Sequence, residues 1–331
     1  MSQTERLFQA QRFATEILNG RMTDQVIADR LQDMGRRGES AEEMLGIANT
    51  FYGLCNRLST VHPMVMDVCG TGGAAVRSFN VSTISAFVLA AAGVPVAKHG
   101  NRSSQGRCGS ADLLEAMGAD ISPGPERSAK MLDSISFTFL FAPAYHPAMR
   151  HVVRARRLVS DRTIFNIIGP LMNPVLGPRR QLMGVCSPEL LETVPSVLRS
   201  LGVDRAMIVH GLPGMDEVSL CGSTLVAELK GEDVERYEIC PEEQGLKRCH
   251  ENKVRELTPQ ASVRVCIDLL RGKANERRDM VLFNCACALY VFGSASSIAA
   301  GLSLAERVID SGNAFSKMQQ YILASNGGEA V

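Results

Sequence analysis

The sequence predicts an α/β protein: a small N-terminal helical domain, followed by a large α/β domain whose mostly parallel central sheet is flanked by helices. Three observations support this. Residues 1–63 show helical spacing of apolar side chains and no candidate strand. From residue 64 onwards, short apolar strands alternate with helical segments, which is typical of parallel sheets. Residues 224–230 and 234–239 resemble a hairpin, which would add an antiparallel edge. We therefore expect a helical domain at 1–63 and an α/β domain at 64–331.

The bulk composition excludes several classes of protein. The chain has 331 residues, with 35 basic and 35 acidic side chains, so its net charge is zero. Neither a nucleic acid nor a membrane surface is therefore expected as a partner. The N-terminus lacks a basic-then-apolar signal, and no 18-residue apolar run occurs. The ten cysteines form no CxxC pair, which favours reduced thiols over disulfides or zinc. We expect a soluble, cytoplasmic protein.

Capping residues define the predicted helices of the N-terminal region. Thr23 is placed to cap a helix that we expect to end at Gly35. Ser40 and Glu43 form a capping box before a third helix. Helices from about 150–180 are expected to join this domain.

A glycine turn stands at the start of the α/β region. An apolar strand at 65–69 runs into Gly70-Thr71-Gly72-Gly73. The polar group Asn80-Val81-Ser82-Thr83 then opens a helix predicted at 84–92. Glycines allow close approach to an anion, and a helix start supplies free amides, so the pattern fits a phosphate site. An ordinary strand–helix turn would look the same, so both interpretations stay open.

Other predicted strands also end in polar residues, and ligands of such sheets bind at the carboxyl ends of strands. Lys98-His99-Gly100-Asn101-Arg102-Ser103 follows a strand predicted at 94–97, and could bind phosphate or form a solvated loop. Asp216-Glu217 follows a strand at 206–209, and could hold Mg²⁺ or form an exposed turn. Ser110 is placed to cap a helix at 111–117. Residues 142–146 follow a strand at 137–141.

A run of arginines offers a partner for a substrate carboxylate. Arg154, Arg156, Arg157 and Arg162 precede the apolar segment 163–171. One guanidinium could bind a carboxylate through two parallel hydrogen bonds. A solvated helix face would have the same sequence, and spacing alone does not identify the arginine that turns inward.

Seven motifs occur in order, and together they closely resemble the anthranilate phosphoribosyltransferase family over nearly the whole chain. They are Gly70-Thr71-Gly72-Gly73, Asn80-Val81-Ser82-Thr83, Lys98-His99-Gly100-Asn101-Arg102-Ser103, Gly109-Ser110-Ala111-Asp112, His146-Pro147-Ala148-Met149, Arg162-Thr163-Ile164-Phe165-Asn166 and Gly214-Met215-Asp216-Glu217. The resemblance implies a homodimer assembled through the helical domain. It also implies transfer of phosphoribose from 5-phosphoribosyl 1-diphosphate (PRPP) to the amine of anthranilate, releasing diphosphate, with Mg²⁺ as cofactor.

The same resemblance implies roles for particular residues. Lys98, Asn101 and Arg156 would carry catalysis, and Ser82, Asp216 and Glu217 would hold Mg²⁺. The residues expected to bind PRPP are Gly70, Gly73, Ala74, Ser78, Asn80, Val81, Ser82, Thr83, Lys98, His99, Gly100, Asn101, Arg102, Ser103, Ser104, Gln105, Gly106 and Ser110. Those expected to bind anthranilate or line its approach are Gly70, Asn101, Arg156, His99, Ala142, Pro143, His146 and Met149.

The sequence departs from the family pattern at four places. Ala74-Ala75 stands where the family keeps Asp-Gly, Ser78 and Met172 replace threonines, and the segment 104–108 differs from the usual serine-rich loop. Two alternatives therefore stay open beside the family's reaction. One is a divergent paralogue that uses another aromatic amine or a pyrimidine nucleoside, and the other is a non-catalytic PRPP-binding or interaction protein.

Overall fold

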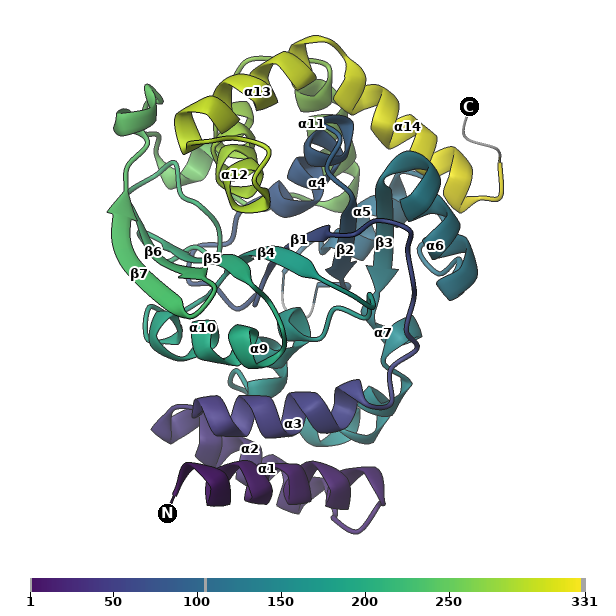
Figure 1. The fold of residues 1–331 in the computed structure, drawn as a ribbon, viewed down its shortest axis with the longest axis vertical. Coiled ribbons are helices and arrows are strands. Elements are labelled where there is room, and N and C mark those ends of the chain that lie inside the picture. Colours follow the sequence, from purple (N-terminus) through teal and green to yellow (C-terminus); the bar gives the residue numbers. More distant parts are fainter. Residues whose placement is uncertain (1, 104–105, 329–331) are drawn as a thin grey trace.

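The computed structural model describes residues 2–103 and 106–328. These form one seven-stranded sheet in the order β3-β2-β1-β4-β5-β6-β7 (Figure 1). The first five strands in that order are parallel, and β6 and β7 are antiparallel. The strand bounds are β1 Val65–Gly70, β2 Val96–Gly100, β3 Phe137–Phe141, β4 Arg179–Gly184, β5 Arg205–Gly211, β6 Thr224–Lys230 and β7 Asp233–Ile239. The predicted fold class, including the antiparallel edge, is confirmed.

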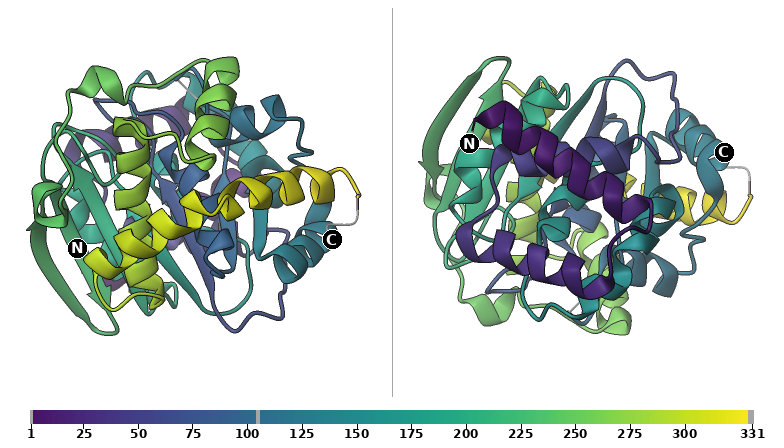
Figure 2. Two further views of the ribbon diagram at one scale, coloured as in Figure 1. Left: turned by 90° about the horizontal axis from the view of Figure 1, so that it is seen from above. Right: turned by 90° about the horizontal axis from the view of Figure 1, so that it is seen from below.

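Helices cover both faces of the sheet (Figures 1 and 2). One apolar cluster joins the upper face to a first helical layer. That layer contains α4 Val81–Ala91, α5 Ser110–Ala116, α6 Gly124–Ile135, α11 Pro259–Leu270, α12 Glu276–Phe292, α13 Ile298–Asp310 and α14 Asn313–Ser325. A second cluster joins the lower face to another six helices. These are α1 Gln3–Leu18, α2 Asp24–Arg37, α3 Ala41–Tyr52, α8 Val153–Arg157, α9 Ile164–Leu171 and α10 Leu190–Ser200.

Local chemistry explains the ends of the N-terminal helices. Thr23 caps α2, and Ser40 with Glu43 forms the predicted capping box of α3. The expectation that α2 ends at Gly35 was wrong, because the helix continues to Arg37. It ends at Gly38, whose φ of +79° is a conformation that residues with a side chain rarely adopt. A single glycine inside a helix costs only about 1 kcal/mol, so Gly35 does not stop it.

Several other boundaries differ from the prediction. Strand β2 runs from Val96 to Gly100, so Lys98 and His99 belong to the strand and not to the loop after it. Helix α4 begins at Val81 and takes in Ser82 and Thr83, which were expected to precede it. The sequence did not indicate β4, α6, α10, α11 or α14. Among the described residues, no helix is long and apolar enough to span a membrane.

The strand register brings the polar strand ends together. Gly70 at the end of β1 pairs with Gly184 at the end of β4, and Gly100 at the end of β2 pairs with Phe141 at the end of β3. Parallel strands therefore end at one edge of the sheet. Short helical segments follow directly after β3, namely α7 Ala142–Tyr145 and η1 Pro147–His151. This edge lies between the two helical layers.

Candidate active site

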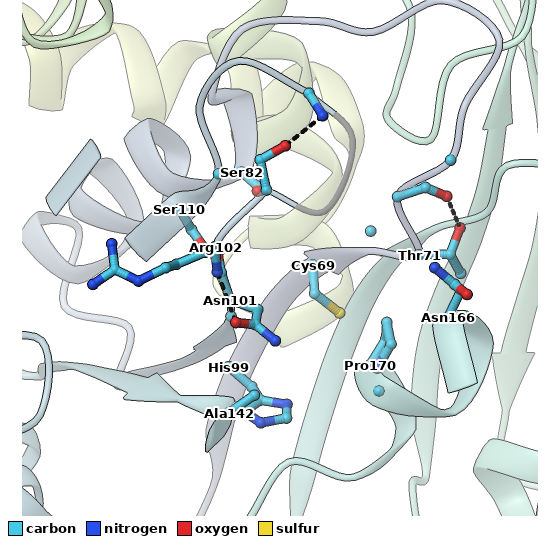
Figure 3. Close-up of a pocket in the computed structure, with 18 of the residues that line it drawn as sticks. Cys69, Thr71, Ser82, His99, Asn101, Arg102, Ser110, Ala142, Asn166 and Pro170 are labelled. Carbon is cyan, nitrogen blue, oxygen red and sulfur yellow. Dashed lines mark hydrogen bonds between the residues drawn. The ribbon is translucent and has the colours of Figure 1, made fainter. Parts of the chain in front are cut away.

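A cavity of about 570 Å³ opens at this edge of the sheet, a size typical of small-molecule sites (Figure 3). The glycine turn, the end of β2, α7 and the 216–217 turn all contribute to its wall. Every residue predicted for the site that the structure describes lines this cavity. Ser104 and Gln105 lie outside the described residues.

The glycine turn has a conformation that needs glycine. Gly72 and Gly73 have φ values of +68° and +75°. The amide of Gly72 donates a hydrogen bond of 2.7 Å to Asp216 Oδ2. Gly70 has no room for a side chain, because a Cβ atom would meet the same carboxylate oxygen at 2.5 Å. The turn after β1 and the acidic turn after β5 are thus packed directly against each other.

Lys98 is a buried cation at the inner end of the cavity. Its residue is only 2 % exposed, and its Nζ donates to the carbonyl oxygen of Val68 at 2.7 Å and to Ser82 Oγ at 3.1 Å. Burial lowers the pKa of Lys98, while the negative charge of Asp67 opposes that shift. Ser82 at the start of α4 therefore lies within hydrogen-bond distance of the ammonium group.

Asp216 and Glu217 present two adjacent carboxylates to the cavity. Withdrawal from water raises the pKa of Asp216, and withdrawal together with the charge of Asp216 raises the pKa of Glu217 well above its usual range. The Ser78 hydroxyl donates to Glu217 Oε1 at 2.8 Å. The buried Oε2 has no hydrogen-bond partner among the described residues.

These donors fit Mg²⁺ better than a transition metal. Mg²⁺ prefers oxygen ligands, keeps several waters and needs only one or two protein carboxylates. Asp216, Glu217 and Ser82 supply such oxygens, and the three lie close together, because all of them also line one small cavity of about 10 Å³. The described residues contain no cluster of three or more His, Cys, Asp or Glu side chains able to hold a metal. Glu217 Oε2, which has no partner among the described residues, is an oxygen that a cation could bind.

Two histidines line the cavity as well. The rings of His99 and His146 meet edge to face, with centroids 5.0 Å apart. Both residues are buried, and burial lowers the pKa of His99 well below its usual range and that of His146 to about 4. Both rings are therefore neutral at pH 7. They offer an aromatic, uncharged surface to the cavity, and Figure 3 shows His99 beside Ala142.

The structure identifies the arginine that turns inward. Arg156 lines the cavity, with its guanidinium 5.9 Å from the ring centroid of Phe165. Partial burial lowers its pKa, and it forms no ion pair with a described carboxylate. Arg154 and Arg157 are exposed, and Arg162 pairs with the buried Glu39 at 3.1 Å. Arg156 is thus the member of the run that is available to a bound carboxylate.

The outer wall is held by Asp112 on α5. Its Oδ2 accepts hydrogen bonds from the amides of Ser103 at 3.0 Å and Gly109 at 2.8 Å. The Arg102 guanidinium forms ion pairs with Asp112 and Glu115. These two carboxylates, which do not line the cavity, therefore neutralise its charge. The expectation that Ser110 caps the helix was wrong. Gly109 occupies the capping position.

Ser110 is the first residue of α5. Its hydroxyl donates to the carbonyl of Asn101 at 3.1 Å. This contact ties the start of the helix to the loop that follows β2. Gly100 has no room for a side chain here, because a Cβ atom would collide with the same hydroxyl group.

Sequence reasoning missed several residues of the wall. Glu256 lines the cavity, and its Oε2 accepts the Arg107 amide at 2.9 Å. Asn166 and Pro170 on α9 line it too, opposite Ser82 in Figure 3. Asn166 stood in a recognised motif but had no assigned role. Glu256 had no local signal at all, because only the fold brings it to this edge.

Comparison with known proteins identifies the family. Residues 62–315 match the family described as "Glycosyl transferase family, a/b domain". The anthranilate phosphoribosyltransferase of Aquifex aeolicus is 43% identical over 312 residues, which cover 94% of this chain and 92% of that protein. The enzyme of Ruminiclostridium cellulolyticum is 41% identical over 313 residues, covering 94% and 91%. The chain belongs to the anthranilate phosphoribosyltransferase family.

Solved structures of anthranilate phosphoribosyltransferases have the same fold. The crystal structure of the enzyme from Thermus thermophilus superposes with a TM-score of 0.89 and 35% identity, covering 99% of this chain and 96% of that one. The Saccharomyces cerevisiae enzyme in complex with PRPP and Mg superposes with a TM-score of 0.87 and 26% identity, covering 98% and 94%. The resemblance found in the sequence is therefore confirmed over nearly the whole chain.

Proposed function

We propose that this chain transfers phosphoribose from PRPP to the amine of anthranilate, giving N-(5-phosphoribosyl)anthranilate and diphosphate with Mg²⁺ as cofactor. One observation supports this most strongly. A single cavity combines an anion-binding end, built from Lys98 and the glycine turn, with Arg156, a cation that no described carboxylate neutralises. The phosphate groups of PRPP need the anion-binding end, and the carboxylate of anthranilate needs a cation such as Arg156. Membership of the anthranilate phosphoribosyltransferase family agrees with both.

The diphosphate end would work by electrostatics. Breaking the bond between C1 and diphosphate places negative charge on the leaving group and positive charge on the ribose. Lys98 is fixed by the fold before the substrate arrives, so its ammonium group can stabilise that charge without reorganising. We assign Asp216, Glu217 and Ser82 to Mg²⁺, which when bound would neutralise diphosphate oxygens.

The acceptor end would orient anthranilate. We assign Arg156 to its carboxylate, and the neutral rings of His99 and His146, with Ala142, Pro143 and Met149, to its aromatic ring and approach. Asn101 also lines the cavity, and we assign it a contact with either substrate. The anthranilate amine is neutral at pH 7 and needs no strong base. Catalysis would then come mostly from positioning, which suits a cavity whose described residues include no activated nucleophile.

Ala74 is compatible with an active enzyme. It is 6 % exposed and lines the cavity where the family pattern keeps an aspartate. The metal assignment does not depend on that position, since Asp216 and Glu217 remain. We expect weaker Mg²⁺ binding than a third carboxylate would give, with turnover retained.

The direct test follows the loss of anthranilate fluorescence on mixing the protein with PRPP, Mg²⁺ and anthranilate. We expect a loss that requires all three and that stops when EDTA is added. Folded protein that binds PRPP without consuming anthranilate would contradict the proposal and favour a PRPP-binding protein. A panel of other aromatic amines and pyrimidine nucleosides tests for a divergent acceptor. We also propose that the anthranilate amine displaces diphosphate from C1 directly, and a covalent ribosyl-enzyme detected by mass spectrometry would overturn this step.

We further propose a division into a helical domain at 1–63, joined by α8 and α9, and an α/β domain at 64–331. The chain would form a homodimer through the helical domain. Phe8 on α1 is 65 % exposed and Val26 on α2 is 44 % exposed, which leaves apolar surface on this side. Light scattering after size exclusion should give twice the chain mass, and Phe8→Ser should lower it. A monomer at micromolar concentration would contradict the dimer.

We place the enzyme in the cytoplasm. All ten cysteines are free thiols in the structure, as expected of a reducing compartment. Fractionation of cells with an antibody against the chain would test this location.

A further inference from the structure

Asn284 on α12 bonds to both polar groups of one residue's backbone. Its Oδ1 accepts the amide of Val218 at 3.1 Å, and its Nδ2 donates to the carbonyl oxygen of Val218 at 2.9 Å. A further bond runs from Nδ2 to the carbonyl of Met280 at 2.9 Å. Asn284 is only 4 % exposed on a helix whose neighbouring residues are apolar and buried. A buried amide in such surroundings is costly unless it is fully bonded, and here it is.

Val218 directly follows the two carboxylates. The segment 216–218 lies between β5 and β6, outside both strands. Asp216 is held from one side, where Gly70 and Gly184 pack against it and the Gly72 amide binds its carboxylate. The Asn284 side chain holds the segment from the other side, across 66 residues of sequence.

Hydrogen bonds hold the Glu217 side chain only in part. Glu217 and Asn284 both line a small cavity of about 10 Å³, together with Ser82, Ser85 and Asp216 among others. One carboxylate oxygen is bonded to Ser78, and the other is free among the described residues. The direction of this side chain is therefore set by the Ser78 hydroxyl together with the backbone at 217–218, which Asn284 anchors.

We propose that Asn284 is a positioning residue for the metal-binding carboxylates. By fixing the backbone of Val218, it aims Glu217 at the side of the cavity where Asp216 and Ser82 also present oxygens. This inference rests on the proposed function, in which these three residues hold Mg²⁺ on the diphosphate of PRPP. Loss of the Asn284 contacts should therefore weaken use of Mg²⁺ and leave recognition of anthranilate unchanged.

Two variants and one control test the role. Asn284→Leu has a similar volume and loses every hydrogen bond, whereas Asn284→Asp keeps an acceptor for the Val218 amide and loses the donor. Asn275→Ala is the matched control. Asn275 caps the same helix by accepting the amides of Arg277 and Arg278, so its loss disturbs α12 without touching Val218.

The readouts are the Mg²⁺ concentration that gives half-maximal rate and the rise in melting temperature when Mg²⁺ and diphosphate are added. For Asn284→Leu we expect the Mg²⁺ concentration at half-maximal rate to rise tenfold or more. The rise in melting temperature on adding Mg²⁺ and diphosphate should become smaller. The KM for anthranilate should stay within twofold. Asn284→Asp should show the same pattern, and it serves alone if the leucine variant does not fold. Asn275→Ala should lower the melting temperature of the free protein and leave both readouts as in the wild type.

Unchanged Mg²⁺ readouts in both Asn284 variants, with a lowered melting temperature, would reduce Asn284 to a structural role and overturn the inference. Glu217→Gln is measured in parallel. If that variant also leaves the Mg²⁺ readouts unchanged, the assignment of the metal site itself fails. If Glu217→Gln shifts them and the Asn284 variants do not, only the positioning role fails.

Discussion

The backbone carbonyl of Asp216 occupies the space that a side chain on Gly184 would need. A Cβ atom built on Gly184 would overlap both the carbonyl carbon and the carbonyl oxygen of Asp216. Gly184 ends β4 beside Gly70, which ends β1, and both residues face the same aspartate. Close approach therefore requires glycine at this strand end, and the position of the acidic turn depends on it.

Gly184→Ala should displace the acidic turn and nearly abolish Mg²⁺-dependent activity. The overlap is with backbone, which cannot rotate away, and such overpacking costs roughly 1–3 kcal/mol of stability. We expect the rate to fall at least about 100-fold because the carboxylates move relative to Lys98. Gly53→Ala is the control, since its Cβ would meet atoms only at 3.5 Å or beyond and its φ is −59°. Equal activity in both variants would show that the turn can adjust.

Arg156→Ala should raise the KM for anthranilate and leave the KM for PRPP nearly unchanged. A hydrogen bond to a charged group contributes about 1.5–3 kcal/mol, so the expected rise is roughly 10- to 100-fold. Arg156→Lys should recover part of the loss, because an ammonium supplies the charge without the planar fork. Arg154→Ala, on the exposed side of the same short helix, should behave as the wild type. Steady-state kinetics with each substrate varied measure the effect, and a change confined to PRPP would reassign Arg156.

The stability of the protein should fall below pH 6.5 because of His146. Its pKa is lowered from 6.5 to about 4 by burial. Above pH 6.5 the ring is neutral in both the folded and unfolded states, so it contributes no pH dependence. As the pH falls towards 4, the unfolded state takes up the proton first, and folding loses about 2 kcal/mol between pH 7 and pH 5 from this group. Urea unfolding of His146→Gln should show a shallower loss over that range, and identical slopes would contradict the assignment.

The sequence indicates β3 because its residues, Phe137 to Phe141, form an almost unbroken apolar run. It does not indicate β4, which begins with Arg179, Arg180 and Gln181. These long polar side chains are accommodated because Arg179 donates to the carbonyl of Leu171 and Gln181 to that of Pro170. For the same reason the sequence did not predict the full length of β2, because a lysine and a histidine lie inside this buried strand. Local patterns do not show that tertiary contacts satisfy such groups.

The candidate site, like the sheet, could be predicted from the sequence only in part. Its inner wall could be predicted because its residues occur in short motifs, and the motifs lie at strand ends that a parallel sheet must bring together. The contacts that support these residues could not be predicted. Asn284 sits in an apolar helix and Glu256 in a charged loop, and each reaches the site only through the packing of distant segments.

Glu256 should hold the segment 106–109 in the conformation that binds PRPP. Its Oε2 accepts the Arg107 amide at 2.9 Å, while its own amide donates to the carbonyl of Arg77 at 3.0 Å. The residue therefore joins the segment after the glycine turn to the segment 106–109. Glu256→Ala should raise the KM for PRPP several-fold. Without this contact, part of the binding free energy of PRPP must be used to order the segment 106–109.

Two further variants separate this role from a charge effect. Glu256→Gln keeps an oxygen for the Arg107 amide and should restore most of the affinity for PRPP. Glu251→Ala removes a carboxylate that lies 3.8 Å from Arg255 instead, and should leave the KM unchanged. A lower KM for PRPP in Glu256→Ala would show the opposite role, with the carboxylate repelling phosphate from an amide it occupies. Titration of PRPP at fixed anthranilate distinguishes these outcomes, since repulsion would also be relieved in the glutamine variant.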